Sequence, residues 1–218
     1  MTEKQKIKLE LEKERIRGMR EFETTLVKDA LGTEVFVIAG IDEAGRGPLA
    51  GPVSAAAVIL RRGWSTPFLN DSKKLSAAKR DELYDVIRAE AIAYAVVMVP
   101  AERIDEINIL QATKEAMLTA VHRLPILPEM LLIDAVKLDG TDLPQASVIK
   151  GDARCQSIAA ASILAKVERD RLMARMDSEY PEYGFLKHKG YGTKEHIEAI
   201  QKFGPCPIHR STFIKSFL

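Results

Sequence analysis

The chain has 218 residues, of which 46% are hydrophobic and 29% are charged, so it is expected to form one globular domain with a small appendage. A formal net charge of +1 excludes recognition of nucleic acid by overall charge, and any such role must rest on local patches. No apolar run reaches the roughly 18 residues of a membrane span and the N-terminus is charged, so we expect a monomeric, cytoplasmic protein without membrane contact. The cysteines Cys155 and Cys206 lack metal-type spacing and are expected to be reduced thiols.

Residues 1–30 are dense in lysine, glutamate and arginine, with thinly spaced apolar residues. Opposite charges one helical turn apart, such as Glu14 and Arg17, favour a solvated helix that Gly18 interrupts or softens. We interpret this segment as a charged helical N-terminal extension. Because its charges nearly balance, packing on the surface explains it better than a dedicated nucleic-acid arm does.

Three continuous apolar runs follow, and their β-branched residues predict buried strands. They are residues 35–41 (VFVIAGI), 53–60 (VSAAAVIL) and 92–99 (IAYAVVMV). Short connections predict that these strands form an antiparallel meander. A helix is expected to begin near Ser76, after the polar turn NDSKKLS.

The apolar spacing then becomes that of a helix over residues 101–123. A fourth strand is predicted at residues 130–133 (MLLI), a short fifth strand at 147–149, and a long helix at 156–180. The order of these elements predicts an α/β fold with a central mixed sheet of five strands flanked by helices.

Four carboxylates fall at the predicted strand ends. Asp42 and Glu43 stand at the end of the first strand, Asp134 at the end of the fourth and Asp152 just after the fifth. If the first and fourth strands are neighbours, these acids converge at the carboxyl edge of the sheet. Clustered carboxylates repel one another unless cations neutralise them, and oxygen-only sites favour Mg²⁺ or Mn²⁺. Two such ions can activate water and stabilise the leaving oxygen in phosphodiester cleavage.

A single Asp after a strand is more often a turn residue or a helix cap than a metal ligand. Asp152 in particular could cap the helix that begins near Arg154. The adjacent pair Asp42 and Glu43 is harder to explain in that way. No arrangement of Ser, Cys or Thr in the sequence suggests a competing nucleophile.

A glycine-rich turn follows the acidic pair, and in it Gly45 and Gly47 would allow close backbone approach while Arg46 could hold a phosphate. A hairpin turn with an incidental arginine explains the pattern equally well. The turn lacks GxxxxGK[ST] and GxGxxG and is followed by a strand, which excludes the common nucleotide-binding loops.

The string from Gly40 to Val53 resembles the signature of bacterial ribonuclease HII. Further blocks match that family in the same order along most of the chain. The blocks are GIDEAGRGPLAGPV (40–53), DSKKLS (71–76), INILQAT (107–113), LLIDA (131–135), KGDARCQSIAAASILAKVERDR (150–171), HKGYGT (188–193) and HRSTF (209–213).

The resemblance implies a ribonuclease H-like fold, with residues 31–184 as the catalytic core and the basic segment 185–218 completing the substrate site. It implies cleavage of the RNA strand of RNA/DNA hybrids and incision on the 5′ side of single ribonucleotides in duplex DNA. The products would carry 3′-hydroxyl and 5′-phosphate ends, in ribonucleotide removal and RNA primer processing. Asp42, Glu43, Asp134 and Asp152 match the four catalytic metal-binding acids, which would hold two Mg²⁺ or Mn²⁺ ions.

The resemblance also implies how ribose is recognised. Gly45, Arg46 and Gly47 match the GRG motif that contacts the 2′-hydroxyl, the group that distinguishes RNA from DNA. Tyr191 matches the tyrosine that stacks on the sugar at the junction between ribonucleotide and deoxyribonucleotide. Ribonuclease HIII usually has glutamate as its fourth acid, so Asp152 favours HII. Thr212 stands where HII often has serine and keeps the hydroxyl group.

Basic residues gather between Phe185 and the end of the chain, with three of the four histidines. Lys73 and Lys189 are interpreted as substrate-binding residues, although a solvated loop explains Lys73 equally well. Lys166 on the predicted long helix is interpreted as a surface or salt-bridge residue. The histidines are interpreted as structural, because that is the more common role of a histidine. The basic set is Lys187, Lys189, Lys194, Lys202, Arg210 and Lys215, and the histidines are His188, His196 and His209.

Two other functions fit the same residues. Another ribonuclease H-like nuclease, such as a resolvase or integrase core, would use the acids without needing a 2′-hydroxyl. A nucleic-acid-binding module would use them to hold a structural ion. A replication or transcription partner also remains open.

Overall fold

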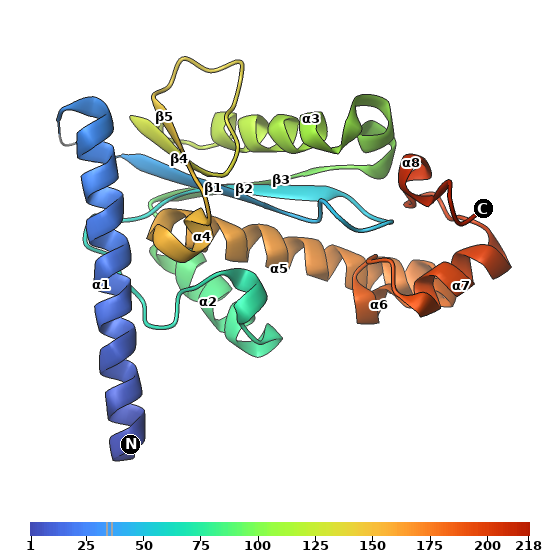
Figure 1. Ribbon diagram of the computed structural model, residues 1–218, viewed down its shortest axis with the longest axis horizontal. Helices are drawn as coiled ribbons and strands as arrows, with labels where there is room; N and C mark the ends of the chain where they lie inside the picture. The colour runs from blue at the N-terminus through green and yellow to red at the C-terminus, as the bar shows by residue number, and fades with distance from the viewer. Residues whose placement is uncertain (34, 36) are drawn as a thin grey trace.

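The computed structural model describes residues 1–33, 35 and 37–218, and it confirms the predicted α/β fold (Figure 1). A five-stranded sheet has the order β3-β2-β1-β4-β5. The first three strands form the predicted antiparallel meander, whereas β4 runs parallel to β1 and β5 runs parallel to β4. The strands are β1 (Ile38–Ala44), β2 (Val53–Ile59), β3 (Ala93–Val99), β4 (Met130–Asp134) and β5 (Gln145–Val148).

The first strand lies later in the chain than the sequence predicts. β1 extends to Ala44 and pairs Asp42 with Ala56 and Glu43 with Ala55. The predicted end of the strand at residue 41 is therefore wrong, because both acids lie within its paired part, at its C-terminal end as predicted. An alanine opposite each acid leaves room for the longer side chain. Of the predicted strand 35–41, Phe36 lies outside the described residues.

Helices cover both faces of the sheet (Figure 1). α3 (Ala101–His122) packs on one face, whereas α2 (Ala77–Glu90) and α5 (Gln156–Glu179) pack on the other. β2 is buried along its whole length because it lies between these two layers. α5 approaches β1 so closely that a Cβ at Gly40 would lie 2.1 Å from the backbone carbon of Ser157, so only glycine fits there.

α1 is a single helix from Glu3 to Leu31, so the predicted interruption at Gly18 is wrong. A capping box of Thr2 and Gln5 begins the helix and Gly32 ends it in the left-handed conformation. One exposed glycine costs only about 1 kcal/mol in a helix, which these caps and the ion pairs along α1 can offset. The N-terminal part of α1 projects beyond the body (Figure 1).

The C-terminal half of α1 packs against the start of α5. Glu23 accepts a hydrogen bond of 3.1 Å from the backbone N–H of Ser157, and Gln156 donates to the carbonyl of Ile16 over 3.2 Å. The guanidinium carbon of Arg154 lies over the ring of Phe22, 4.1 Å from the ring centroid. α5 has no side-chain cap from its own N-cap residue, so the carboxylate of Glu23 takes this place.

We expect Glu23→Ala to reduce the free energy of unfolding by about 1 to 2 kcal/mol, as the loss of a helix cap does. Burial raises the pKa of Glu23, and the hydrogen bonds from Ser157 lower it only in part. Because burial makes the charged form less favourable, we expect the loss at neutral pH to lie toward the lower value. Urea denaturation would measure it. Glu21→Ala on the same helix removes an exposed acid and is the matched control, with an expected change below about 0.5 kcal/mol. Equal effects of the two substitutions would contradict the cap.

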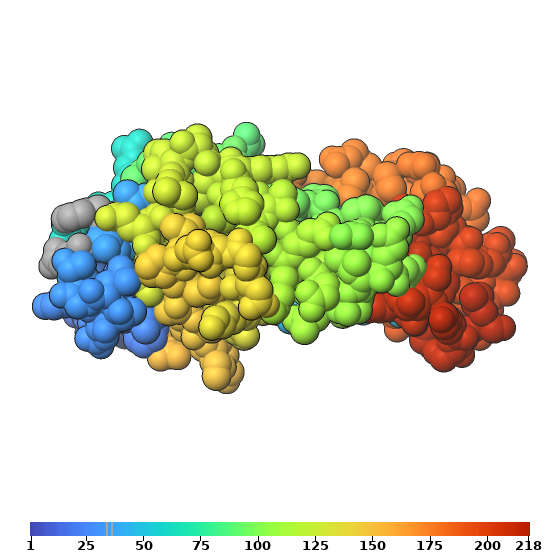
Figure 2. Space-filling model, turned by 90° about the horizontal axis from the view of Figure 1, so that it is seen from above, coloured from blue at the N-terminus to red at the C-terminus, as the bar shows by residue number. Residues whose placement is uncertain are grey.

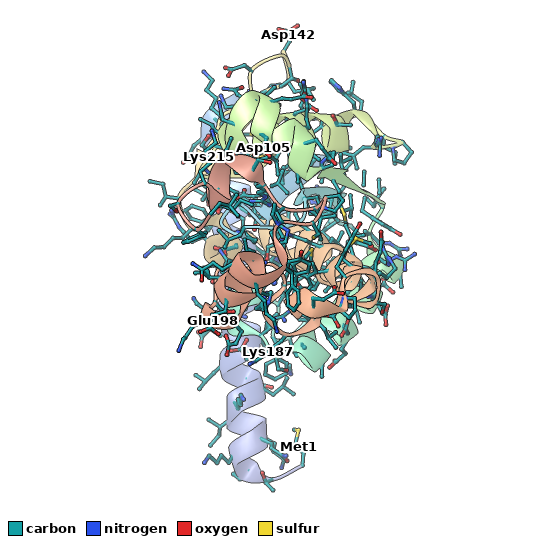
Figure 3. All side chains as sticks on the ribbon, turned by 90° about the vertical axis from the view of Figure 1, so that its right-hand side faces the viewer. Met1, Asp105, Asp142, Lys187, Glu198 and Lys215 are labelled. Carbon is teal, nitrogen blue, oxygen red and sulfur yellow. The ribbon has the colours of Figure 1, made fainter. Side chains whose placement is uncertain are left out.

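The C-terminal part of the chain forms short helices. It lies at the end of the molecule opposite α1 (Figure 2). Asp105 on α3 lies beside this region (Figure 3). Its carboxylate accepts hydrogen bonds from the backbone N–H groups of Ser211 and Thr212. Among the described residues, no helix combines the length and the hydropathy that a membrane-spanning segment needs. The remaining helices are η1 (Ser72–Lys74), α4 (Gly151–Arg154), η2 (Pro181–Tyr183), α6 (Phe185–His188), α7 (Lys194–Phe203) and α8 (Ser211–Ile214).

Candidate active site

The strand pairing brings the acids of distant sequence positions to one edge of the sheet. β1 and β4 are parallel neighbours with Ile41 opposite Ile133, so Asp42 and Asp134 follow side by side at the carboxyl ends. Asp152 lies on α4 just after β5. The Oδ1 atom of Asp134 accepts a hydrogen bond of 2.7 Å from the N–H of Gly151, which connects the end of β4 to α4.

The four acids lie within electrostatic reach of one another. Burial raises the pKa of Asp42 well above its ordinary value, and the charges of Glu43, Asp134 and Asp152 raise it further. Burial also raises the pKa of Glu43. Burial and the carboxylates of Asp71 and Asp134 raise the pKa of Asp152 to about 6. The site therefore disfavours four negative charges and would be stabilised by cations.

Asp71 is an acid near this site that the sequence reasoning missed. It ends the connection from β2 and accepts a hydrogen bond of 2.9 Å from the N–H of Lys73. Partial burial opposes the charge of Lys73, but the carboxylates of Asp42, Asp71 and Asp152 raise its pKa. Lys73 is exposed but lies within electrostatic reach of the acids. The block DSKKLS contained the signal, although Asp71 follows no predicted strand.

The donor set suits a divalent cation. Every donor is a carboxylate oxygen, and Oε2 of Glu43 is buried without a hydrogen-bond partner. Within residues 1–33, 35 and 37–218, no three His, Cys, Asp or Glu side chains converge closely enough to form one ion's ligand sphere. The acids thus fit a cation by their chemistry and proximity, while a ligand sphere would need their side chains to draw closer together.

The glycine-rich turn connects β1 to β2 directly beyond the acids. Gly45 has φ of 93°, and a Cβ there would lie 2.1 Å from Nε of Arg169, so both backbone and space require glycine. A Cβ at Gly47 would meet only the ring of Tyr191, at 3.8 Å. The side chain of Arg46 is 43% exposed, and its Nη1 lies 3.7 Å from Oε1 of Glu43.

Two buried arginines hold this turn, and the sequence reasoning missed their role. Arg210 donates to the carbonyl oxygens of Arg46, Gly45 and Gly51 over 2.8, 2.5 and 2.9 Å. Its assignment to the exposed basic patch is wrong, because Arg210 is 0% exposed. Arg169 on α5 donates to three more carbonyl oxygens, those of Ala50, Pro52 and Lys189. Both bind backbone groups, which no sequence motif reveals.

The loop that carries Tyr191 lies against the turn. The N–H of Leu49 donates to the carbonyl of Gly190 over 2.8 Å, and a Cβ at Gly190 would lie 2.5 Å from the oxygen of Ala50. Tyr191 is 43% exposed beside Gly47. The structure therefore brings Tyr191 and the GRG turn together.

The other basic candidates are placed differently. The ammonium of Lys189 donates to the carbonyl of Leu186 in its own loop over 2.6 Å. Lys166 forms an ion pair of 2.6 Å with Asp170, which confirms its salt-bridge interpretation. The cysteines are free thiols, and the three C-terminal histidines are buried away from solvent.

A mixed sheet in this strand order, with acids on its central parallel pair, defines the class of ribonuclease H-like nucleases. The family model described as Ribonuclease HII matches residues 39–216. The chain belongs to the ribonuclease HII family and is a nuclease that hydrolyses phosphodiester bonds.

Known proteins resemble the chain over most of its length. Ribonuclease HII of Acetivibrio thermocellus is 55% identical over 216 residues, which cover 99% of this chain and 83% of the relative. Ribonuclease HII of Bacillus cytotoxicus is 57% identical over 210 residues, covering 96% and 79%. The crystal structure of ribonuclease H2 from Pyrococcus horikoshii has a TM-score of 0.68 at 27% identity and covers 83% of this chain and 96% of its own.

Proposed function

We propose that the protein cleaves the RNA strand of RNA/DNA hybrids and incises duplex DNA on the 5′ side of single embedded ribonucleotides. The products would carry 3′-hydroxyl and 5′-phosphate ends, which suits ribonucleotide removal and RNA primer processing. One observation carries the proposal. The acids of β1 and the GRG turn are almost contiguous in sequence, with only Ala44 between Glu43 and Gly45. The catalytic acids and the groups proposed to recognise ribose therefore lie on one continuous segment, the strand β1 and its turn.

Asp42, Glu43, Asp134 and Asp152 would hold the metal ions. Two Mg²⁺ or Mn²⁺ ions, when bound, would supply Lewis-acid activation of water and charge neutralisation at the leaving oxygen. The N–H of Gly151 orients Asp134 before substrate arrives. Lys73 is exposed and within electrostatic reach of the acids, so its ammonium group could contact the phosphate that approaches them.

Recognition of ribose would use the GRG turn and Tyr191. The carbonyl groups of Gly45 and Arg46 are already held by Arg210, so the turn is preorganised and loses little conformational freedom on binding. A 2′-hydroxyl both donates and accepts hydrogen bonds, which suits a site made of backbone groups. The exposed ring of Tyr191 offers a stacking surface beside the turn.

Cleavage-site mapping tests this proposal on an end-labelled duplex with one ribonucleotide. We expect one cut on its 5′ side with Mg²⁺ and with Mn²⁺, and none in the presence of a chelator. An all-DNA duplex of the same sequence should react at least about a thousandfold more slowly, since a missing hydroxyl leaves polar groups of the site unpaired.

Equal cleavage of the all-DNA duplex would replace the proposal with the resolvase or integrase type of nuclease. Binding without metal-dependent cleavage of any duplex would replace it with the binding module. Arg46→Ala should reduce the preference for the ribonucleotide, and because it also removes the ion pair with Glu43, the ratio of cleavage rates on the two duplexes is the readout and not the rate alone.

A further inference from the structure

Three histidines from different segments of the C-terminal region are buried together. His188, His196 and His209 are 8%, 0% and 4% exposed. The rings of His188 and His196 stack with centroids 4.4 Å apart, and Phe185 and Tyr183 contact the cluster edge-on. Burial of several titratable rings in one place is costly unless each is neutral and hydrogen-bonded, so the cluster needs an explanation.

The hydrogen bonds determine where the protons lie. Nδ1 of His196 is 2.9 Å from the carbonyl oxygen of Tyr191, and a carbonyl cannot donate, so this nitrogen carries a proton. The backbone N–H of Cys206 donates to Nδ1 of His209 over 2.9 Å, a shorter contact than the 3.2 Å from the same nitrogen to the carbonyl oxygen of Cys206, so we assign this nitrogen as an unprotonated acceptor. His209 therefore carries its proton on Nε2 and donates it to Nε2 of His196, 3.0 Å away.

This arrangement requires both rings to be neutral. A further proton on Nε2 of His196 would face the N–H group at Nε2 of His209. If His209 instead moved its proton to Nδ1, that N–H would face the backbone N–H of Cys206. Burial lowers the pKa of His196 to about 4 and also lowers that of His209, and the neighbouring His188 adds to both effects. The titratable groups that face the pair are His188, Tyr183 and Cys206, none of which is a carboxylate.

The chain of hydrogen bonds ends on the backbone of Tyr191. Its carbonyl oxygen accepts from His196 and, over 2.8 Å, from the N–H of Thr193, while its own N–H donates to the carbonyl of His188. The peptide groups on both sides of Tyr191 are thus held from the interior. Its ring is left 43% exposed, beside Gly47 of the turn.

We propose that His196 and His209 are positioning residues that act through Tyr191, because the neutral pair fixes the carbonyl of Tyr191 and so directs its ring toward the substrate beside the GRG turn. Both histidines are buried and neither reaches substrate or the acids. The inference rests on the proposed role of Tyr191 in substrate binding. It assigns a role in substrate affinity to residues that contact no substrate.

A double-mutant cycle on steady-state cleavage of a duplex with one ribonucleotide tests this inference. Tyr191→Ala and His196→Ala are each expected to raise KM about tenfold, the effect of losing one stacking contact, with kcat within about twofold. The double variant should have the KM of Tyr191→Ala alone, since the histidine acts through the ring. His196→Gln, whose amide can donate to Tyr191 and accept from His209, should recover most of the affinity.

Phe185→Leu is the matched control, because Phe185 packs on His196 without a side-chain hydrogen bond to the loop. It should lower Tm while leaving KM at the wild-type value. Unchanged KM in Tyr191→Ala would overturn the proposed role of Tyr191 and this inference with it. A raised KM in Tyr191→Ala with unchanged KM in His196→Ala, or effects that multiply in the double variant, would overturn the inference alone.

Discussion

Asp42→Asn is expected to reduce Mg²⁺-dependent cleavage of a ribonucleotide-containing duplex by about a thousandfold or more. Asp42 is 5% exposed and lies between Glu43 on its own strand and Asp134 on the next, so it can reach an ion shared by the group. Asparagine keeps the shape but removes one negative charge, and neutral oxygen binds a hard cation far more weakly. Single-turnover cleavage at saturating substrate would measure the loss.

The same substitution should stabilise the fold in a chelating buffer. A carboxyl whose pKa is raised on folding contributes its full stability below its unfolded-state pKa, and that contribution is lost as pH rises through the folded pKa. Burial and its acidic neighbours raise the pKa of Asp42, so at neutral pH the carboxyl destabilises the native state. We expect a higher Tm for Asp42→Asn than for wild type at pH 7.5, and a difference that shrinks toward pH 4.

Asp139→Asn is the control for both effects. Asp139 is an exposed acid that pairs with Lys114 over 2.7 Å in the connection between β4 and β5. It should keep wild-type cleavage and should not raise Tm. Wild-type rates in a clean preparation of Asp42→Asn would remove Asp42 from the proposed metal ligands, and an unchanged or lower Tm would contradict the destabilising environment.

Arg210→Met is expected to have the largest effect on stability, about 3 kcal/mol. Methionine fills similar space but leaves the carbonyl oxygens of Gly45, Arg46 and Gly51 without their donor, at about 1 to 3 kcal/mol for each buried group. Part of this loss is offset because burial of the cation is itself unfavourable, as the lowering of the pKa of Arg210 to about 9 indicates. Urea denaturation would measure the net change.

Arg210→Lys keeps the charge but cannot supply the planar fork of donors, so an intermediate loss is expected. Among folded variants, KM for the ribonucleotide-containing duplex should rise while Mg²⁺ dependence stays that of wild type. Arg103→Met replaces an exposed arginine that pairs with Glu115 and should change the free energy of unfolding far less than Arg210→Met does. Equal losses for the two methionine variants would show that Arg210 does not hold the turn.

The sequence predicted the sheet because its signals are local. Apolar β-branched runs marked the strands, and the order of elements predicted a mixed sheet, which the pairing of β1 with β4 confirms. The acids could be found for the same reason, since each stands at or near a strand end. The boundary of β1 was wrong because pairing with an alanine-rich neighbour extends a strand through Asp42 and Glu43, an effect of tertiary structure.

The support of the recognition groups could not be predicted in this way. Arg210 and Arg169 donate to carbonyl oxygens that lie far away in the sequence. For example, Arg210 binds the carbonyl of Gly45, which is 165 residues earlier in the chain. An arginine looks the same in sequence whether it binds phosphate or backbone. Asp71 was missed for a related reason, because its role depends on which neighbours the fold supplies. The histidines were expected to be structural, but the sequence did not show that they contact one another.

The continuity of β1 with the glycine-rich turn has a consequence for the timing of the reaction. Strand pairing persists to Ala44 opposite Ser54, and Arg210 holds the next two carbonyl groups, so no hinge separates Asp42 from Gly45. Because this segment has no hinge, its acids and its recognition groups cannot move relative to each other, and the segment discriminates by fit rather than by closure of a lid. We therefore expect a bound duplex that contains a ribonucleotide to be cleaved without a slow conformational step between binding and the chemical step.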